Sequence, residues 1–176
     1  MNIFVKRRGS NRLVPPLLVL LAILAFAAFF LLPLWGRLTI SNYREETKLL
    51  TLPVNKGESF QIAYLHSINL SPVKDTIEWT GESLTVRESW FKTFGAGIPI
   101  PADGIGEELI KVNNGYILTN INKEQESFLL MSEDVPNHHL IYRGREISLL
   151  ALGGAGTLLK FEVKKVSLLT CLRLDG

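Results

Sequence analysis

Cysteine is nearly absent from this chain, which has a single one, Cys171, among 176 residues. One cysteine excludes an intramolecular disulfide framework and any zinc or iron–sulfur site built from several cysteines. A basic block is missing as well. The formal net charge is +2, and four basic residues precede an apolar run, so the rest of the chain carries −2. This faintly acidic body argues against nucleic acid as a partner.

Histidines and glycine motifs are also scarce. Of the three histidines, His138 and His139 are adjacent, and neighbours on a strand face apart, so the sequence predicts no metal site and no cofactor. The glycines of residues 94–104 form no G-x-G-x-x-G, and neither a Lys-Ser/Thr pair nor a helical pattern follows them. We therefore expect a crossover loop between sheets there, with a ligand-contacting rim as the alternative.

The N-terminal part of the chain contains a long apolar run. Residues 13–36 contain no charged side chain, and about 20 apolar residues suffice for a helix to cross the hydrocarbon core. Its far end shows no Ala-x-Ala cleavage site, which favours an uncleaved transmembrane anchor over a cleaved signal peptide. Basic residues are in excess before the run, so we expect residues 1–12 to be a cytoplasmic tail. Residues 37–48 would be a linker, and residues 49–176 a domain outside the cytoplasmic membrane.

After the linker the pattern changes to short runs of period two separated by turn residues. We expect an all-β fold, an antiparallel sandwich or small barrel of about nine strands, preceded by one transmembrane helix. Hairpins are expected at Asn113-Asn114-Gly115, which is a two-residue turn signal, at Arg143-Gly144-Arg145 and, as a looser signal, at Gly153-Gly154-Ala155-Gly156. The predicted strands lie within residues 58–67, 73–80, 83–92, 107–112, 115–121, 127–132, 138–143, 145–152 and 157–166.

The connection between the first two predicted strands collects groups that could carry chemistry. In a hydrolase, Ser67 or Ser71 would be the nucleophile, His66 the base and Asp75 the residue that orients it. Adjacent strand residues point to opposite faces, which argues against a His66–Ser67 pair, and there is no G-x-S-x-G elbow. The structural alternative is that His66 and Asp75 are cross-strand neighbours joined by a hydrogen bond; a ligand-contacting role is also open.

Two motifs together resemble a bacterial family called domain of unknown function 1850. The first reads F-x-x-x-Y-x-H-S-x-x-x-S-P-V-x-D, where the family usually has Glu at the place of Asp75. The second reads F-G-A-G-I-P, where the family more often has Leu at the place of Ile98. The matching positions are Phe60, Tyr64, His66, Ser67, Pro72, Val73, Asp75, Phe94, Gly95, Ala96, Gly97 and Pro99.

The resemblance implies a membrane-anchored extracytoplasmic domain with no established enzyme activity. Family members often stand beside TRAP-type solute transporters of the TAXI class, so it implies an accessory role beside the permease or its solute-binding protein. We therefore expect a non-catalytic interaction module. The alternatives are an envelope hydrolase using His66, Ser67 and Asp75, and a domain that binds a small anionic solute through His66 and Arg87.

Overall fold

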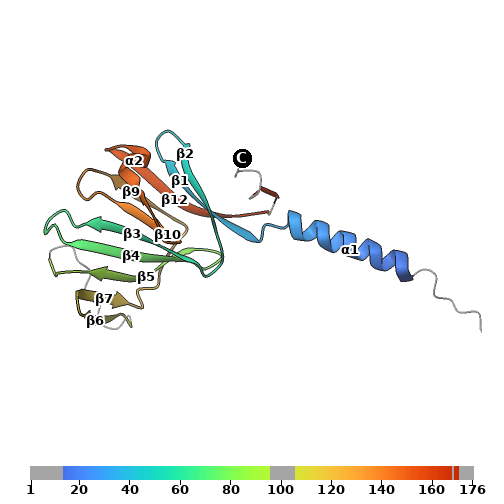
Figure 1. Ribbon diagram of the computed structural model, residues 1–176, viewed down its shortest axis with the longest axis horizontal. Coiled ribbons are helices and arrows are strands. Elements are labelled where there is room, and N and C mark those ends of the chain that lie inside the picture. Colours follow the sequence, from blue (N-terminus) through green and yellow to red (C-terminus); the bar gives the residue numbers. More distant parts are fainter. Residues whose placement is uncertain (1–13, 96–105, 168, 171–176) are drawn as a thin grey trace, which may run out of the picture. The chain divides into compact units, whose positions relative to one another are not determined.

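Two open antiparallel sheets make up the β-rich part of the chain (Figure 1). The computed structural model describes residues 14–95, 106–167 and 169–170. Contacts divide the chain into two units, one of which is Trp35–Lys165. The four-stranded sheet has the order β2-β1-β12-β9, with β1 at Trp35–Asn42, β2 at Thr47–Val54, β9 at Ser127–Ser132 and β12 at Thr157–Val166.

The eight-stranded sheet contains the strands that position the candidate site. Its order is β11-β10-β3-β4-β5-β7-β6, and β8 pairs with β5 beside β7. The strands are β3 (Ser59–Leu65), β4 (Pro72–Trp79), β5 (Leu84–Phe91), β6 (Glu108–Val112), β7 (Gly115–Thr119), β8 (Lys123–Gln125), β10 (His139–Tyr142) and β11 (Arg145–Ser148).

The all-β prediction is confirmed, but two of its details are wrong. The described chain has twelve strands instead of about nine, and the sheets are open, so there is no barrel. The predicted linker at residues 37–48 forms β1 and the start of β2, and β8 was also missed. Charged residues around this segment suggested a linker, yet Leu38 and Ile40 alternate with polar residues and are fully buried.

One predicted strand is split between a strand and a helix. Residues 145–152 alternate well enough to suggest a single strand, but β11 ends at Ser148 and a short helix α2 (Leu149–Gly153) follows. Ser148 is the N-cap of this helix, and its Oγ accepts a hydrogen bond from the Ala151 N–H at 3.2 Å. Serine is a preferred N-cap residue, so the cap ends the strand here.

The core lies between the two sheets. Its largest cluster takes Leu38 and Ile40 from β1 and Leu159 and Phe161 from β12 of the small sheet. The large sheet contributes Phe60, Ile62, Ile77, Trp79, Leu84, Leu140 and Tyr142. A second, smaller cluster contains Val73, Phe91 and Leu118. Burying apolar side chains from both sheets holds the layers together.

A β-bulge divides β5 into two halves. The register pairs Thr76 with Glu88 and Ile77 with Val86, which leaves Arg87 as an extra residue without a cross-strand partner in β4. Before the bulge, Val86 faces the same side as Ile77; after it, residues 89 and 91 do so. One inserted residue thus exchanges the inward and outward positions of the strand.

The two ends of β4 differ in their surroundings. At the end of β4, Trp79 is 2 % exposed, and a Cβ placed on Gly36 would lie 2.2 Å from its ring, so only glycine permits this approach. At the other end, Pro72 pairs with Leu65. An eight-residue strand separates these points by roughly 20–25 Å. The chain therefore enters the β domain far from the β3–β4 connection.

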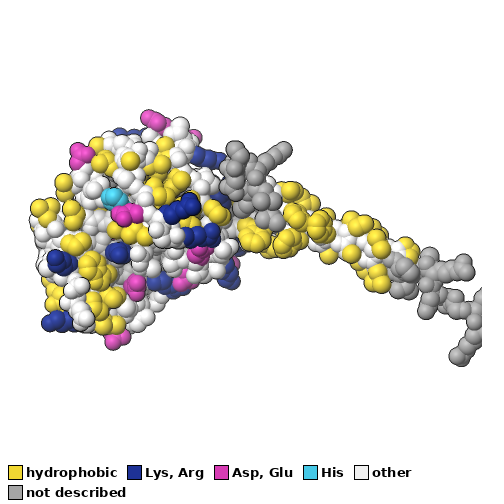
Figure 2. All heavy atoms as spheres, viewed as in Figure 1, with side chains coloured by type: hydrophobic (Ala, Val, Ile, Leu, Met, Phe, Trp, Pro, Cys, Tyr) yellow, Lys and Arg dark blue, Asp and Glu magenta, His cyan; other side chains and the backbone are white. Residues whose placement is uncertain are grey.

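The N-terminal helix α1 (Val14–Leu31) carries no charged residue, and its described side chains are mostly exposed (Figure 2). Within the residues that the structure describes, no helix combines the length and apolar character that crossing a membrane needs. Trp35 and Gly36, which the predicted anchor included, belong to β1. The predicted cytoplasmic tail, residues 1–12, and Cys171 lie outside the described residues.

Candidate functional site

The segment that contains His66 and Ser67 is the connection from β3 to β4. Its backbone folds back on itself, because the His66 N–H donates to the Ser71 carbonyl and the Leu70 N–H donates to the His66 carbonyl, each at 2.9 Å. The half-buried His66 ring accepts a long hydrogen bond at Nδ1 from the Ile68 N–H at 3.4 Å, while Ser67 is exposed. His66 thus shapes its own loop.

Asp75 lies on the core side of β4 and bonds to groups other than His66. Its register partners are Ile62 on β3 and Ser89 on β5. The Ser89 hydroxyl donates to Asp75 Oδ1 at 2.6 Å, and the Tyr64 side chain also bonds to this carboxylate. The expected His66–Asp75 bond is therefore wrong. The register places His66 beyond the end of β3, whereas Asp75 is three residues inside β4.

A polar seam, defined as Tyr64, Asp75, Ser89 and His138, separates the two apolar clusters along β4. The Tyr64 and His138 ring centroids are 5.2 Å apart. Burial raises the pKa of Asp75, against the opposing effect of the Ser89 and Tyr64 hydrogen bonds. Burial and then the neighbouring Asp75 charge raise the pKa of Tyr64. The Tyr64 hydroxyl therefore keeps its proton near neutral pH.

The fourth member of the seam, His138, is held in its neutral form. Burial, followed by the charge of His139, lowers the pKa of His138 to about 4. Its Nδ1 is buried and has no hydrogen-bond partner among the described residues. His139 faces elsewhere, with its Nδ1 3.0 Å from Glu146 Oε1. The two rings face different neighbours, Tyr64 and Glu146, as expected for adjacent residues in an extended chain.

The loop rim is defined as residues 66–71, 92–95 and 133–138, which meet at the Pro72 end of β4. The buried Ser71 hydroxyl accepts hydrogen bonds from the Thr93 hydroxyl at 2.8 Å and the Thr93 N–H at 3.2 Å. The Leu65 N–H donates to the Pro136 carbonyl at 2.9 Å. These bonds tie three segments that are distant in sequence into one surface.

Phe94 and Gly95 of the second motif belong to this rim. A Cβ on Gly95 would lie 2.3 Å from the Asn69 amide nitrogen, so glycine allows the two loops to touch. The Phe94 ring packs on Tyr116, with centroids 4.4 Å apart. Ala96, Gly97 and Pro99, the remaining matching positions of this motif, lie outside the described residues. The structure thus brings the described parts of both motifs together.

Large apolar side chains are exposed on the loop rim. Ile68 is 70 % exposed, Leu70 63 %, Val135 54 % and Phe94 45 %. Leu70 also has a φ of 48°, a left-handed conformation that costs a non-glycine residue about 1–2 kcal/mol. A strained backbone that holds an apolar side chain in solvent is a feature found at functional sites.

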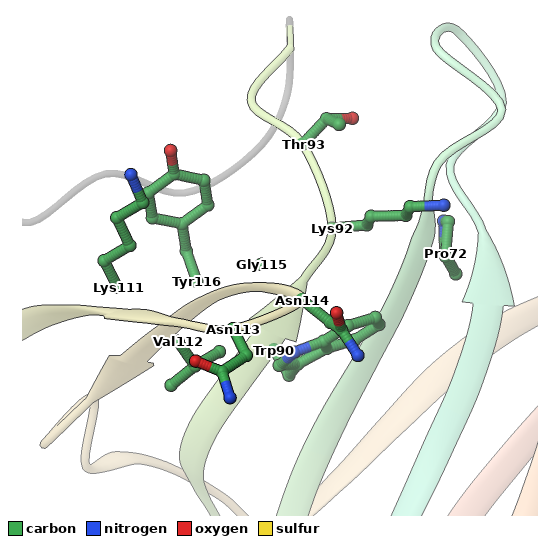
Figure 3. A pocket seen from close by; sticks show the side chains of 10 residues that line it. All are labelled: Pro72, Trp90, Lys92, Thr93, Lys111, Val112, Asn113, Asn114, Gly115 and Tyr116. Carbon is green, nitrogen blue, oxygen red and sulfur yellow. The ribbon is translucent and has the colours of Figure 1, made fainter.

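A pocket of about 710 Å³ adjoins the rim beside the β6–β7 hairpin (Figure 3). Two aromatic, two basic and two carboxamide side chains stand out in its lining, namely Trp90, Tyr116, Lys92, Lys111, Asn113 and Asn114. Figure 3 shows Lys111 beside the Tyr116 ring and Lys92 extended toward Pro72. Among the described residues that line it there is no carboxylate. This pocket was not predicted from the sequence. Trp90 and Lys92 come after the bulge in β5, where the alternation of inward and outward residues is shifted by one position.

The catalytic arrangement considered from the sequence does not assemble in the described residues. Among the described residues no hydrogen bond joins His66 to Asp75 or to the Ser67 hydroxyl, and the serine that bonds to Asp75 is Ser89. Arg87, a suggested solute contact, instead pairs with Glu78 at 2.9 Å on the other face of the sheet. Among the described residues, no three His, Cys, Asp or Glu side chains are grouped as metal ligands.

The comparisons with known proteins give one match. The family model described as "Domain of unknown function (DUF1850)" matches residues 60–149, half of the chain. Searches of curated proteins and of solved structures find no significant match. The matched region runs from Phe60 in β3 to the first residue of α2, so it contains the loop rim, the polar seam and the pocket.

Proposed function

The chain belongs to the DUF1850 family, and from this premise we propose that it is a membrane-anchored, non-catalytic module that binds another protein. The domain would stand outside the cytoplasmic membrane, with the N-terminus inside. Its partner would be the permease or the solute-binding protein of a TAXI-class TRAP transporter, as the resemblance implies. An anchor that confines both partners to one membrane raises their effective concentration, so a weak contact suffices.

The observation that carries this proposal is the exposed apolar surface of the loop rim. Ile68 and Leu70 stand in solvent on a loop whose backbone is fixed by its own hydrogen bonds. Apolar side chains on a fixed surface lose little conformational entropy on binding, which favours recognition of a protein. The rim also lies at the end of β4 remote from Gly36, where the chain enters the domain.

The membrane anchor is supported by the sequence. Residues 13–36 are uncharged, and apolar side chains such as Leu17 and Phe26 are exposed along α1. Basic residues in excess before this run favour a cytoplasmic N-terminus. A reporter enzyme that is active only outside the cytoplasm, fused after Gly176, should be active. The same fusion lacking residues 1–34 should be inactive, and activity of both would contradict the anchor.

Photocrosslinking in native membranes tests the partner. A photoreactive residue in place of Ile68, in the full chain, should capture a permease or a solute-binding protein of the transporter. The matched control carries the same residue in place of Lys56, which is exposed on the turn between β2 and β3, away from the rim. Capture of the same proteins from both positions, or of neither transporter protein from position 68, would contradict the proposal.

Leu70→Gly separates binding from folding. Glycine relieves the positive φ and removes the apolar side chain, so stability should stay unchanged or rise by up to about 1 kcal/mol while capture of the partner falls. Glu46→Gly is the control, because Glu46 also has a positive φ, 56°, and lies on a turn of the other sheet. That variant should gain similarly in thermal unfolding yet capture the partner normally.

A further inference from the structure

The pocket beside the β6–β7 hairpin has the lining of a ligand site. We propose that it binds a small organic anion, a carboxylate attached to a planar apolar body. The pocket shares Lys92 and Thr93 with the loop rim, but Ile68 and Leu70, on which the proposed function rests, do not line it. The volume of about 710 Å³ falls in the range of small-molecule sites, roughly 300–1,000 Å³.

Charge selects an anion. Lys92 and Lys111 line the pocket, and neither forms an ion pair with another described residue. Lys160 and Lys164, by contrast, lie 2.8 and 2.9 Å from the carboxylate of Glu162. Lysines without a carboxylate beside them leave a local positive potential, and a bound carboxylate would neutralise it.

The aromatic side chains select a planar apolar body. Trp90 and Tyr116 line the pocket together with the carboxamides of Asn113 and Asn114. The Tyr116 ring is fixed from behind, since it stacks on Phe91 at 5.8 Å and packs against Phe94 at 4.4 Å. A ring held in place offers a flat surface at little entropic cost. The amides can orient a polar group of the ligand.

The hairpin that forms one wall is preorganised. Val112 pairs with Gly115 across the two-residue turn, and Tyr116 pairs with Phe91 on β5. Gly115 has a φ of 151°, and a Cβ there would lie 2.4 Å from the Phe91 carbonyl oxygen. This approach, which a side chain would prevent, fixes the hairpin against the end of β5. The pocket is therefore present before any ligand arrives.

Equilibrium dialysis of labelled benzoate against the full chain in detergent micelles tests the site, with empty micelles as the blank. Benzoate should bind saturably below roughly 10 mM, and benzamide, which has the same ring without the charge, about tenfold more weakly. The pair Lys92→Gln and Lys111→Gln should weaken benzoate binding about tenfold. Trp90→Leu should abolish the preference for benzoate over acetate.

The control is the charge-matched pair Lys56→Gln and Lys165→Gln, at exposed lysines that do not line the pocket. This variant should bind benzoate like the unmodified chain, and thermal unfolding should show that all variants fold.

Three results would overturn the site: equal weakening of benzoate binding by both lysine pairs, equal binding of benzoate and benzamide, or no saturable binding. The site would also be overturned if Lys92→Gln abolished transporter crosslinking but left benzoate binding intact. That result would mean that these lysines contact an acidic protein surface. Failed crosslinking from position 68 leaves the dialysis result unaffected, so the two proposals can fail separately.

Discussion

The two ends of β4 show how one strand serves two purposes. Around Trp79 the packing is dry and close, with Gly36 against the indole ring and residues of both sheets in contact. Around Pro72 the strand leads into the polar seam, the exposed loop rim and the pocket. The comparison teaches that stability is concentrated at the Trp79 end, whereas the surfaces available for binding lie at the Pro72 end. Three substitution experiments can sharpen or break this contrast.

The largest difference is expected between two aromatic residues at opposite ends. Trp79→Ala should lower the free energy of unfolding by about 3–5 kcal/mol, because it leaves a cavity between the sheets. Phe94→Ala should cost less than about 1.5 kcal/mol, because this ring is 45 % exposed and loses its contacts with Tyr116 and Phe91. Urea unfolding of the full chain measures both. Equal losses would mean that the rim is as much a part of the core as Trp79.

A middle-sized effect is expected in the polar seam. Asp75→Ala should cost about 1–3 kcal/mol, because it leaves the hydroxyls of Ser89 and Tyr64 without their acceptor. Asp75→Asn keeps an acceptor oxygen and removes a buried charge, so it should cost less. Asp134→Ala, at an exposed position, serves as the control in the same urea titration. If Asn proves as costly as Ala, the charge itself holds the seam together.

The smallest effects are expected in the pH dependence of stability, which differs between groups at the two ends of β4. Burial lowers the pKa of His138, at the Pro72 end, from 6.5 to about 4, so its neutral form is favoured in the folded state. The contribution of neutral His138 to folding stability is complete above pH 6.5 and is lost as the pH falls toward 4. The Arg143 hydrogen bond lowers the pKa of Glu58, at the Trp79 end, from 4.5 to about 2. Its contribution is complete above pH 4.5 and is lost as the pH falls toward 2.

Melting temperatures measured across this range should therefore respond differently to two variants. His138→Gln should flatten the decline between pH 6.5 and 4, and Glu58→Gln should flatten the decline between pH 4.5 and 2. Asp75 has the opposite effect on stability. Its raised pKa means that the folded state takes up a proton at a higher pH than the unfolded state, so this group favours folding as the pH falls. Each variant is compared with the unmodified chain, so this background cancels. A His138→Gln chain with an unchanged decline above pH 4.5 would contradict the pKa assigned to His138.

Much of the β architecture could be predicted from alternation alone. The runs that became β3, β4, β6 and β9 were located within a few residues, and the hairpins at residues 113–115 and 143–145 are present. Their turns differ, however. Arg143 and Gly144 have the positive φ values expected of such a turn, whereas Asn113 and Asn114 are not among the positive-φ residues, and it is Gly115 that has a φ of 151°. Close packing against Phe91, rather than turn type, explains that glycine.

The site was less predictable, because it depends on register between distant strands. Alternation puts Asp75 on one strand face with Ile77 and Trp79, but nothing local indicated that Ser89, fourteen residues later, would supply its hydrogen bond. The two motifs did converge at the rim, which their resemblance to one family could suggest but spacing could not. The strand β1 was missed for a related reason, since its sheet neighbour β12 lies more than a hundred residues away, and β2 pairs only with β1.

Arg87 is the extra residue of the bulge in β5, and its presence affects how the sequences of relatives are aligned. Without it, positions 84 and 86 and those now numbered 89 and 91 would follow one unbroken every-second-residue pattern facing the same partners on β4. A homologue one residue shorter at this point could therefore keep the same interior. Alignments of relatives should open a single gap here, and otherwise they will equate inward-facing residues of one protein with outward-facing residues of another.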